Sequence, residues 1–250
     1  MTNLVGHRVQ NYEIGCTTIE MADNKCCIAT YNMHGMNTGR SGLVDLCNNP
    51  QIKLIAVQEH WLTPSNIHLL NSIHPEFVGF GISAVTSRLG TEVYCGRPYG
   101  GVGFLWHKSL CHTVIIGAVA ESGRCLSVEI ELDSREKINV ITVYFPCYNS
   151  SVQYSVDLAE CLAYIEDVVS NGLSSVLLGD LNFPCDGQNE GYRQCYSVLS
   201  RYNIYHCDEF LGTDTCYTYY NCSLHQSSFI DHMFVSDVIR NDIINASEVK

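Results

Sequence analysis

Short apolar runs alternate with helical patterns along the chain from residue 26 onward. The runs at 26–31 and 53–58 each end in a polar residue, as a strand does where it leaves a protein core. Residues 41–48 have helical spacing, and residues 63–73 begin with Thr-Pro, a common start of a helix. Gly, Ser and charged turns separate the next strand-like runs, which predicts antiparallel hairpins built from 101–106, 113–119, 126–132 and 138–145.

The last third of the chain returns to alternating helix and strand. Residues 152–169 carry one broad apolar face and predict a helix. An apolar strand at 175–179 follows and ends at Asp180, and residues 191–201 predict a further helix before a last strand at 228–236. Mixed strands with helices outside them predict an α/β fold of two packed sheets covered by helices.

The pattern indicates one domain with a short N-terminal extension. The chain has 250 residues, 46% hydrophobic and 16% charged, which is a length that single domains reach. No internal repeat, low-complexity tract or linker divides it. Residues 1–24 are mixed in polarity without clear periodicity, so we predict a loose N-terminal leader before a domain that spans 25–250.

Charge and cysteine content restrict the classes of function. The 14 Lys and Arg against 26 Asp and Glu give a net charge of −12, so any contact with nucleic acid must be local. No run is long enough for a signal sequence or a membrane span, which predicts an intracellular protein with reduced thiols and no membrane contact. The 14 cysteines are interpreted as scattered buried thiols, because Cys216, Cys222 and His225 lack a second cysteine pair to complete a metal site.

Polar side chains interrupt four predicted strands at or near their ends. Asn32 and Glu59 follow the first two strands, Asp180 and Asn182 follow 175–179, and Asp231 lies in the last strand. If these positions converge, they form an oxygen-rich pocket suited to a hard divalent cation such as Mg²⁺. The alternative is that each residue only ends its strand in a turn. Four such positions in this order favour the pocket.

Six segments in a fixed order carry a family resemblance. The chain resembles the endonuclease/exonuclease/phosphatase superfamily over about residues 26 to 240, through segments 30–35, 58–61, 100–103, 143–146, 179–182 and 228–232. Segments 58–62 and 96–101 are similar to the apurinic-like endonuclease domain of non-LTR (LINE-type) retrotransposons. The resemblance implies a DNase I-like α/β fold, a four-layer sandwich of two mixed β-sheets flanked by helices, in agreement with the order of elements predicted above.

The resemblance also implies a metal centre with an activated water. Asn32 and Glu59 would hold Mg²⁺, with Mn²⁺ as an alternative, and Glu59 would be the principal ligand. Asp180 would orient or deprotonate the attacking water, and Asn182 would contact the scissile phosphate. Their i, i+2 spacing would let both side chains point the same way from an extended segment.

Further roles follow from the same resemblance. Tyr144 would donate its hydroxyl to a phosphate oxygen, with a merely packed tyrosine as the alternative. Asp231 would steady a catalytic histidine. A loop whose backbone approaches phosphate, or else an ordinary hairpin turn, is predicted at the substrate-binding candidates Arg97, Tyr99 and Gly101.

The chain departs from the family pattern after Asp231. The Ser-Asp-His motif that ends the family pattern is not found there, and His232 is a poor substitute because successive strand side chains face opposite ways. We therefore expect a domain truncated at its C-terminus, with impaired activity. His34 stands where family members carry an acidic or small polar residue, and we interpret it as a non-ligand.

The reaction these residues predict is metal-dependent hydrolysis of a phosphodiester. In a retrotransposon, a nick in target DNA yields the 3′-hydroxyl that primes reverse transcription, so a reverse transcriptase region would be the partner and the nucleus the site of action. The alternatives are a lipid or inositol phosphate phosphoesterase of the same superfamily, a catalytically inactive remnant or interaction module, and a zinc or redox protein built on the cysteines.

Overall fold

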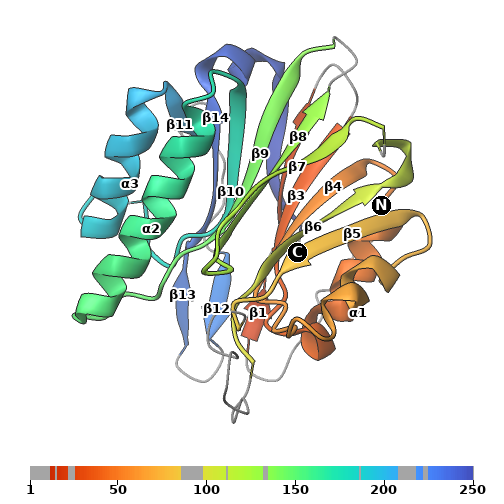
Figure 1. The fold of residues 1–250 in the computed structure, drawn as a ribbon, viewed down its shortest axis with the longest axis horizontal. Coiled ribbons are helices and arrows are strands. Elements are labelled where there is room, and N and C mark those ends of the chain that lie inside the picture. Colours follow the sequence, from red (N-terminus) through yellow and green to blue (C-terminus); the bar gives the residue numbers. More distant parts are fainter. Residues whose placement is uncertain are drawn as a thin grey trace.

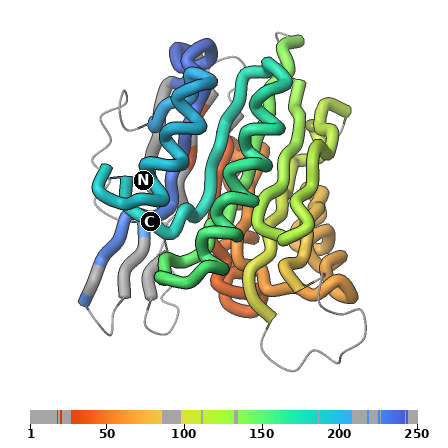
Figure 2. The backbone as a smooth tube through the Cα atoms, turned by 60° about the vertical axis from the view of Figure 1, so that its left-hand side comes forward, coloured from red at the N-terminus to blue at the C-terminus, as the bar shows by residue number. Residues whose placement is uncertain are grey.

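Two six-stranded β-sheets lie face to face in the computed structural model, with helices on both outer sides (Figure 1). The structure describes residues 12–14, 16–21, 26–85, 98–110, 112–131, 135–185, 187–207, 218–221 and 225–249. Helices α2 (Val152–Val169) and α3 (Glu190–Arg201) lie side by side over one sheet (Figure 2). The predicted α/β sandwich of two mixed sheets flanked by helices is confirmed.

The first sheet combines the early strands with the end of the described chain. It runs from β15 (Ile243–Val249) through β2 (Cys16–Met21), β3 (Cys26–Asn32), β4 (Ile52–Gln58) and β6 (Val102–His107) to β5 (Phe77–Ile82). Strands β3 and β4 are parallel and are joined by α1 (Met36–Asn48). On β4, Ile55 and Val57 belong to the core under α1, whereas Leu54 and Ala56 belong to the core between the sheets. Because both faces are covered, residues 54–57 of β4 are all apolar.

The second sheet carries the later strands. It runs from β11 (Ile204–His206) through β14 (Asp231–Ser236), β10 (Ser174–Asp180), β9 (Lys137–Tyr144) and β8 (Cys125–Glu131) to β7 (Val114–Val119). Strands β9 and β10 are parallel, and α2 connects them. The side chain of Ser151 caps α2 by accepting the N–H of Tyr154 at 3.2 Å. Leu158 and Ile165 of α2 are buried in one core cluster with Leu177 of β10.

A buried glutamine joins the two sheets just before the rim that carries the polar residues. Gln58 on β4 is fully buried and accepts the hydroxyl of Thr30 at 3.1 Å through Oε1. Its Nε2 donates to Oγ1 of Thr142 on β9 in the other sheet at 2.9 Å. Both ends of the carboxamide are therefore paired in the interior, which fixes the position of one sheet against the other.

The segment at 63–73 differs from its predicted helix. It forms a turn and then a short 3₁₀ helix, η1 (Ile67–Ser72). The side chain of Asn66 accepts the N–H of Thr63 at 2.7 Å, which favours a local turn over the start of an α-helix. Strand β5 follows and was not predicted, because Gly79 and Gly81 weaken its strand pattern. A Cβ at Gly79 would lie 2.4 Å from the carbonyl oxygen of Leu70, so glycine permits η1 to approach this strand.

The prediction of a loose leader over 1–24 is wrong for its described part. Residues 16–21 form β2, which pairs with both β3 and β15. A small third sheet joins β1 (Tyr12–Ile14) to β12 (Tyr219–Asn221) and β13 (Gln226–Ser228). Strand β3 follows β2 closely in the sequence, whereas β15 and β12 lie far along the chain, and local periodicity does not reveal pairing with them.

Two expectations from composition concern membrane spans and thiols, and the described ranges bear on both. No helix there is both long and apolar enough to cross a membrane. Most of the described free thiols are buried, as expected for cysteines that serve as small apolar residues: Cys27, Cys47, Cys125, Cys161, Cys195 and Cys207.

Candidate active site

The polar strand ends meet at one rim of the sandwich. Asn32 ends β3, and Glu59 directly follows its parallel neighbour β4. Asp180 ends β10 in the other sheet, where it lies opposite Tyr144 on β9 and opposite Asp231 on β14. The structure thus brings these five residues together from both sheets.

Asn32 links the carboxylates of the two sheets. Its Nδ2 donates to Oε1 of Glu59 and to Oδ2 of Asp180, each at 2.9 Å. Its Oδ1 accepts the backbone N–H of His34 at 3.0 Å, which fixes the orientation of the carboxamide. Two acidic side chains therefore converge on a single neutral group.

The loop after β4 holds Glu59 in an unusual conformation. The second carboxylate oxygen of Glu59 accepts the indole N–H of Trp61 at 3.0 Å. Glu59 and Trp61 have φ of 52° and 54°, and His34 in the neighbouring loop has φ of 48°. The rings of His34 and Trp61 lie 4.9 Å apart. Left-handed backbone at non-glycine residues is uncommon and gathers at functional sites, so this cluster favours a binding or catalytic role for the rim.

The prediction for Asp180 and Asn182 assumed an extended segment through both residues, but the chain turns at Asn182. Its backbone N–H donates to Oδ1 of Asp180 at 2.8 Å and its φ is 54°, so a tight turn begins where β10 ends. Its Nδ2 donates to the carbonyl of Phe145 at 2.8 Å, and its Oδ1 accepts the thiol of Cys147 at 3.1 Å. Asn182 still lies beside Asp180, because the carboxylate itself closes the turn.

Burial and like charge shift the ionisation of the rim. The pKa of Asp180 is raised well above its usual value, first by burial and then by the nearby carboxylate of Asp231, with a smaller contribution from Glu59. The pKa of Tyr144 is also raised, first by burial and then by Glu59, so its hydroxyl keeps its proton at neutral pH. The rim therefore combines excess negative charge with one protonated phenol.

The side chains at this rim fit a hard divalent cation. Carboxylate and carboxamide oxygens are the donors that Mg²⁺ and Mn²⁺ prefer. The pKa of Asp180 is raised first by burial and then by the neighbouring carboxylates of Asp231 and Glu59, and a cation would relieve the repulsion between these acidic groups. Glu59 could hold such an ion through its carboxylate, and Asn32 could contribute only its Oδ1, which here accepts the N–H of His34.

The predicted substrate-binding residues Tyr99 and Gly101 differ in their exposure to solvent. Arg97 lies outside the described residues. Tyr99 is 46% exposed, whereas Gly101 is buried with φ of 84°, and a Cβ there would lie 2.3 Å from the ring of His60. His60 is buried: its Nε2 lies 3.0 Å from the carbonyl of Ile82, and its Nδ1 accepts a backbone N–H. Close packing on His60 thus accounts for glycine at 101.

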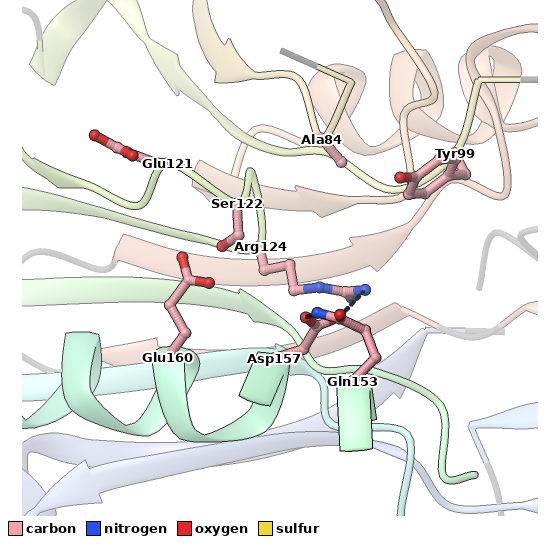
Figure 3. A pocket seen from close by; sticks show the side chains of 8 residues that line it. All are labelled: Ala84, Tyr99, Glu121, Ser122, Arg124, Gln153, Asp157 and Glu160. Atoms are coloured by element: carbon pink, nitrogen blue, oxygen red, sulfur yellow. Dashed lines mark hydrogen bonds and ion pairs between the residues drawn. The ribbon is translucent and has the colours of Figure 1, made fainter. Parts of the chain in front are cut away.

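A pocket beside the rim contains a basic residue that sequence reasoning missed. It has a volume of about 360 Å³ and is lined by residues that include Tyr99, Arg124 and Asp157 (Figure 3). The guanidinium of Arg124 lies 5.5 Å from the ring centre of Tyr144 and donates to the carbonyl of Tyr144 at 3.3 Å. It also pairs with Asp157 of α2 at 3.3 Å. Arg124 lies in a hairpin turn without a recognisable motif, so only the fold reveals its position.

His232 faces away from this rim, as the strand alternation predicted. Its Nε2 lies 2.9 Å from the carbonyl oxygen of Phe183, and its ring lies near His206 on the side of the sheet that the helices cover. The neighbouring residue Asp231 lies at the rim opposite Asp180. His232 therefore does not replace the histidine of the family pattern.

The family model for the endonuclease/exonuclease/phosphatase family matches residues 29–242. The chain belongs to this family. Comparison with curated proteins gives no significant match. The family consists of hydrolytic nucleases and phosphatases that generally use divalent metal ions.

Solved structures support the same fold. A 3′-5′ exonuclease from Neisseria meningitidis matches with a TM-score of 0.60 and 17% identity, over 86% of this chain and 88% of that one. An AP endonuclease from Archaeoglobus fulgidus matches with a TM-score of 0.58 and 13% identity, over the same shares of the two chains, 86% and 88%. One structure of the Neisseria enzyme, described as a 3′ phosphatase, contains a product DNA hairpin. These similarities establish a DNase I-like fold.

Proposed function

We propose that this chain is a metal-dependent phosphodiesterase that nicks DNA, as the endonuclease domain of a non-LTR retrotransposon does. One observation carries the proposal. Asn32 donates hydrogen bonds both to Glu59, which follows the neighbouring strand of the same sheet, and to the buried Asp180 of the other sheet. This arrangement gathers oxygen ligands, a proton acceptor and a protonated phenol at a single rim.

Each residue has a role that its surroundings support. Asn32 and Glu59 would hold Mg²⁺ or Mn²⁺, which when bound supplies Lewis-acid stabilisation of charge on the phosphate. Asp180 would accept a proton from water, and the burial and neighbouring carboxylates that raise its pKa make it a stronger acceptor. Tyr144 would donate its hydroxyl to a phosphate oxygen as charge develops.

Asn182 and Asp231 would position these groups. Asn182 closes the turn on Asp180, so it fixes one carboxylate oxygen while its carboxamide lies at the edge of the rim. Asp231 lies opposite Asp180 in the register of the two strands. The hydroxyl of Thr218 accepts the backbone N–H of Asp231 at 3.0 Å, which anchors the start of β14.

DNA is the substrate that the comparisons favour. The Neisseria enzyme binds a DNA hairpin, and the second similar structure is an AP endonuclease. Arg97 and the exposed Tyr99 would contact the backbone of the DNA locally, because a net charge of −12 gives no general attraction to it, whereas the buried Gly101 would shape the loop. The segments 58–62 and 96–101 support the retrotransposon assignment, in which a reverse transcriptase region is the partner and the nucleus is the site of action.

Nicking of supercoiled plasmid by the 250-residue chain tests the proposal. We expect relaxed circles in Mg²⁺ or Mn²⁺, with 3′-hydroxyl ends that a polymerase extends, and no product in EDTA. Asp180→Asn should abolish nicking, whereas the control Asp167→Asn on the exposed side of α2 should not. Phosphate release from inositol phosphates without nicking would favour the phosphoesterase alternative. Metal binding without turnover of either substrate would favour an inactive remnant.

A further inference from the structure

A second cluster of metal-binding side chains lies on the face of the second sheet that the helices cover. Cys185 lies in the loop after β10, His206 ends β11, and His232 lies on β14. One ligand atom from each residue lies within 4.8 Å of the other two. None of these three side chains has a role in the proposed phosphodiester hydrolysis.

Strand pairing brings the two histidines together. His206 pairs with Phe234, two residues beyond His232 on the neighbouring strand, so both imidazoles lie on the same face. Nε2 of His206 is 3.0 Å from Nδ1 of His232. Sγ of Cys185 is 3.3 Å from the same Nδ1. Both distances involve Nδ1 of His232, and Sγ of Cys185 lies within 4.8 Å of a ring nitrogen of His206.

The separations resemble those of a zinc site. Zn–N bonds of about 2.0 Å and a Zn–S bond of about 2.3 Å in tetrahedral geometry place neighbouring ligand atoms about 3.3 to 3.6 Å apart. The observed N···N distance of 3.0 Å lies slightly below this range, and the observed S···N distance of 3.3 Å lies at its lower limit. Small side-chain shifts therefore suffice to admit an ion.

The orientation of His232 is fixed as metal-bound histidines require. Its Nε2 lies 2.9 Å from the carbonyl oxygen of Phe183 and donates its proton there. This bond leaves the lone pair of Nδ1 directed at His206 and Cys185. A histidine ligand whose second nitrogen donates to a backbone carbonyl is a recurrent feature of metal sites.

The surroundings of the cluster are apolar and shielded. His206 and His232 are 5% and 1% exposed. The ring of Phe229 lies 4.7 Å from that of His232, and the ring of Phe234 lies 4.8 Å from that of His206. Cys185 is half-buried at the side of the two shielded imidazoles. A set of nitrogen and sulfur ligands suits a borderline-soft cation and disfavours the hard Mg²⁺.

We propose that Cys185, His206 and His232 bind a Zn²⁺ ion, with water as the fourth ligand. Zinc fits better than copper, because copper sites of the His₂Cys type add a weak axial ligand that is often methionine. Met233, the methionine next to His232, belongs to the core between the sheets on the opposite face of β14.

The ion would tie the edge of the active-site rim to the sheet. Cys185 follows Asn182 by three residues in the same loop, and His232 follows Asp231 directly. Zinc would therefore join the loop that carries Asn182 to β11 and β14 without touching the reacting atoms. Zinc binding itself does not depend on the proposed nuclease function.

Metal analysis of the purified 250-residue chain tests the proposal. The protein is stripped with chelator, equilibrated with Zn²⁺ in excess Mg²⁺, freed of unbound metal and analysed by elemental mass spectrometry. We expect one zinc ion per chain and a higher thermal midpoint with zinc than without it. Substitution with Co²⁺ should give a thiolate-to-cobalt absorption band, which identifies sulfur as a ligand.

The variants separate this site from the other cysteines. Cys185→Ser and His206→Asn should each weaken zinc binding by about 100-fold or more and remove the cobalt–thiolate band. The controls Cys147→Ser and His74→Asn should keep both signals. After removal of metal with chelator, Cys185→Ser and the parent chain should have the same circular dichroism spectrum. This result would exclude misfolding as the cause of weaker zinc binding.

Three results would overturn the proposal. The first is absence of zinc from the equilibrated parent chain. The second is equal zinc content in Cys185→Ser and the parent chain, because the metal would then lie elsewhere. The third is retention of copper with an intense thiolate band when zinc is not retained.

Discussion

Nδ2 of Asn32 lies 2.9 Å from Oδ2 of Asp180, and this hydrogen bond joins the ends of strands that belong to different sheets. The same nitrogen bonds Glu59 at 2.9 Å. A neutral carboxamide thereby separates two carboxylates that would otherwise face each other across the rim.

Replacement of Asn32 should disable the rim without unfolding the protein. Asn32→Ala removes the group between Glu59 and Asp180, so the two carboxylates lose a shared donor and the cation loses a ligand. We expect kcat for plasmid nicking to fall by about 10²- to 10⁴-fold. The control Asn48→Ala, at the exposed end of α1, should retain activity. Equal activity of Asn32→Ala and the parent chain would contradict the assigned role.

Tyr144→Phe should affect turnover more than binding. The hydroxyl keeps its proton because burial and Glu59 raise the pKa of Tyr144, so it can donate to the developing charge on phosphate. Removing one such donor should lower kcat by about 10²- to 10³-fold with a small change in KM. Steady-state kinetics of plasmid nicking measures both kcat and KM, and Tyr148→Phe, at an exposed tyrosine, is the matched control. A change in KM alone would indicate that Tyr144 only packs against the substrate.

Two glycine substitutions should separate steric overlap from backbone strain. Gly101 has φ of 84°, and its added Cβ would lie 2.3 Å from the buried ring of His60. Gly172 has a similar φ of 82°, but nothing lies within 4 Å of its added Cβ. Gly172→Ala should lower the free energy of unfolding by about 1–2 kcal/mol, and Gly101→Ala by about 3–5 kcal/mol. Equal losses in urea unfolding would show that packing on His60 is not what requires glycine at 101.

The buried thiol of Cys195 should make the fold sensitive to alkaline pH. Burial raises the pKa of Cys195 from 9.0 to about 12. Below pH 9 the thiol is protonated in both states, whereas between about 9 and 12 only the unfolded chain releases the proton. The free energy of unfolding should therefore fall as pH rises above 9, with about 1.4 kcal/mol per pH unit from this group. Urea unfolding from pH 8 upward should show a shallower pH dependence for Cys195→Ala, and parallel curves would refute this assignment.

The sequence predicts much of the sandwich because its strands are apolar on one or both faces. The helix at 152–169 and the strand ends at Asn32, Glu59 and Asp180 follow from local pattern. Strand β5 could not be predicted in this way, because Gly79 and Gly81 interrupt its apolar pattern. Glycine is required there by the close approach of η1. Strand β2 pairs with the nearby β3 and with the distant β15, and no local signal reveals the second pairing.

The residues of the candidate site also fall into those that local pattern predicts and those that only the fold brings together. Residues at strand ends are visible in the sequence, because a polar residue interrupts an apolar run. Arg124 and the cluster of Cys185, His206 and His232 arise only when separate strands and loops meet. The turn at Asn182 is an intermediate case: Asp180 favours a turn after a strand, but only the structure shows that its carboxylate accepts the N–H of Asn182.

The central claim is tested most directly by measuring Mn²⁺ binding and plasmid nicking on the same samples of the parent chain and of Glu59→Gln. Electron paramagnetic resonance measures the bound Mn²⁺. The account predicts one Mn²⁺ at the rim of the parent chain, and loss of both that signal and nicking in Glu59→Gln. The control Glu131→Gln, exposed at the end of β8, should keep both. Unchanged Mn²⁺ binding and nicking in Glu59→Gln would show that the metal and the chemistry lie elsewhere on the protein.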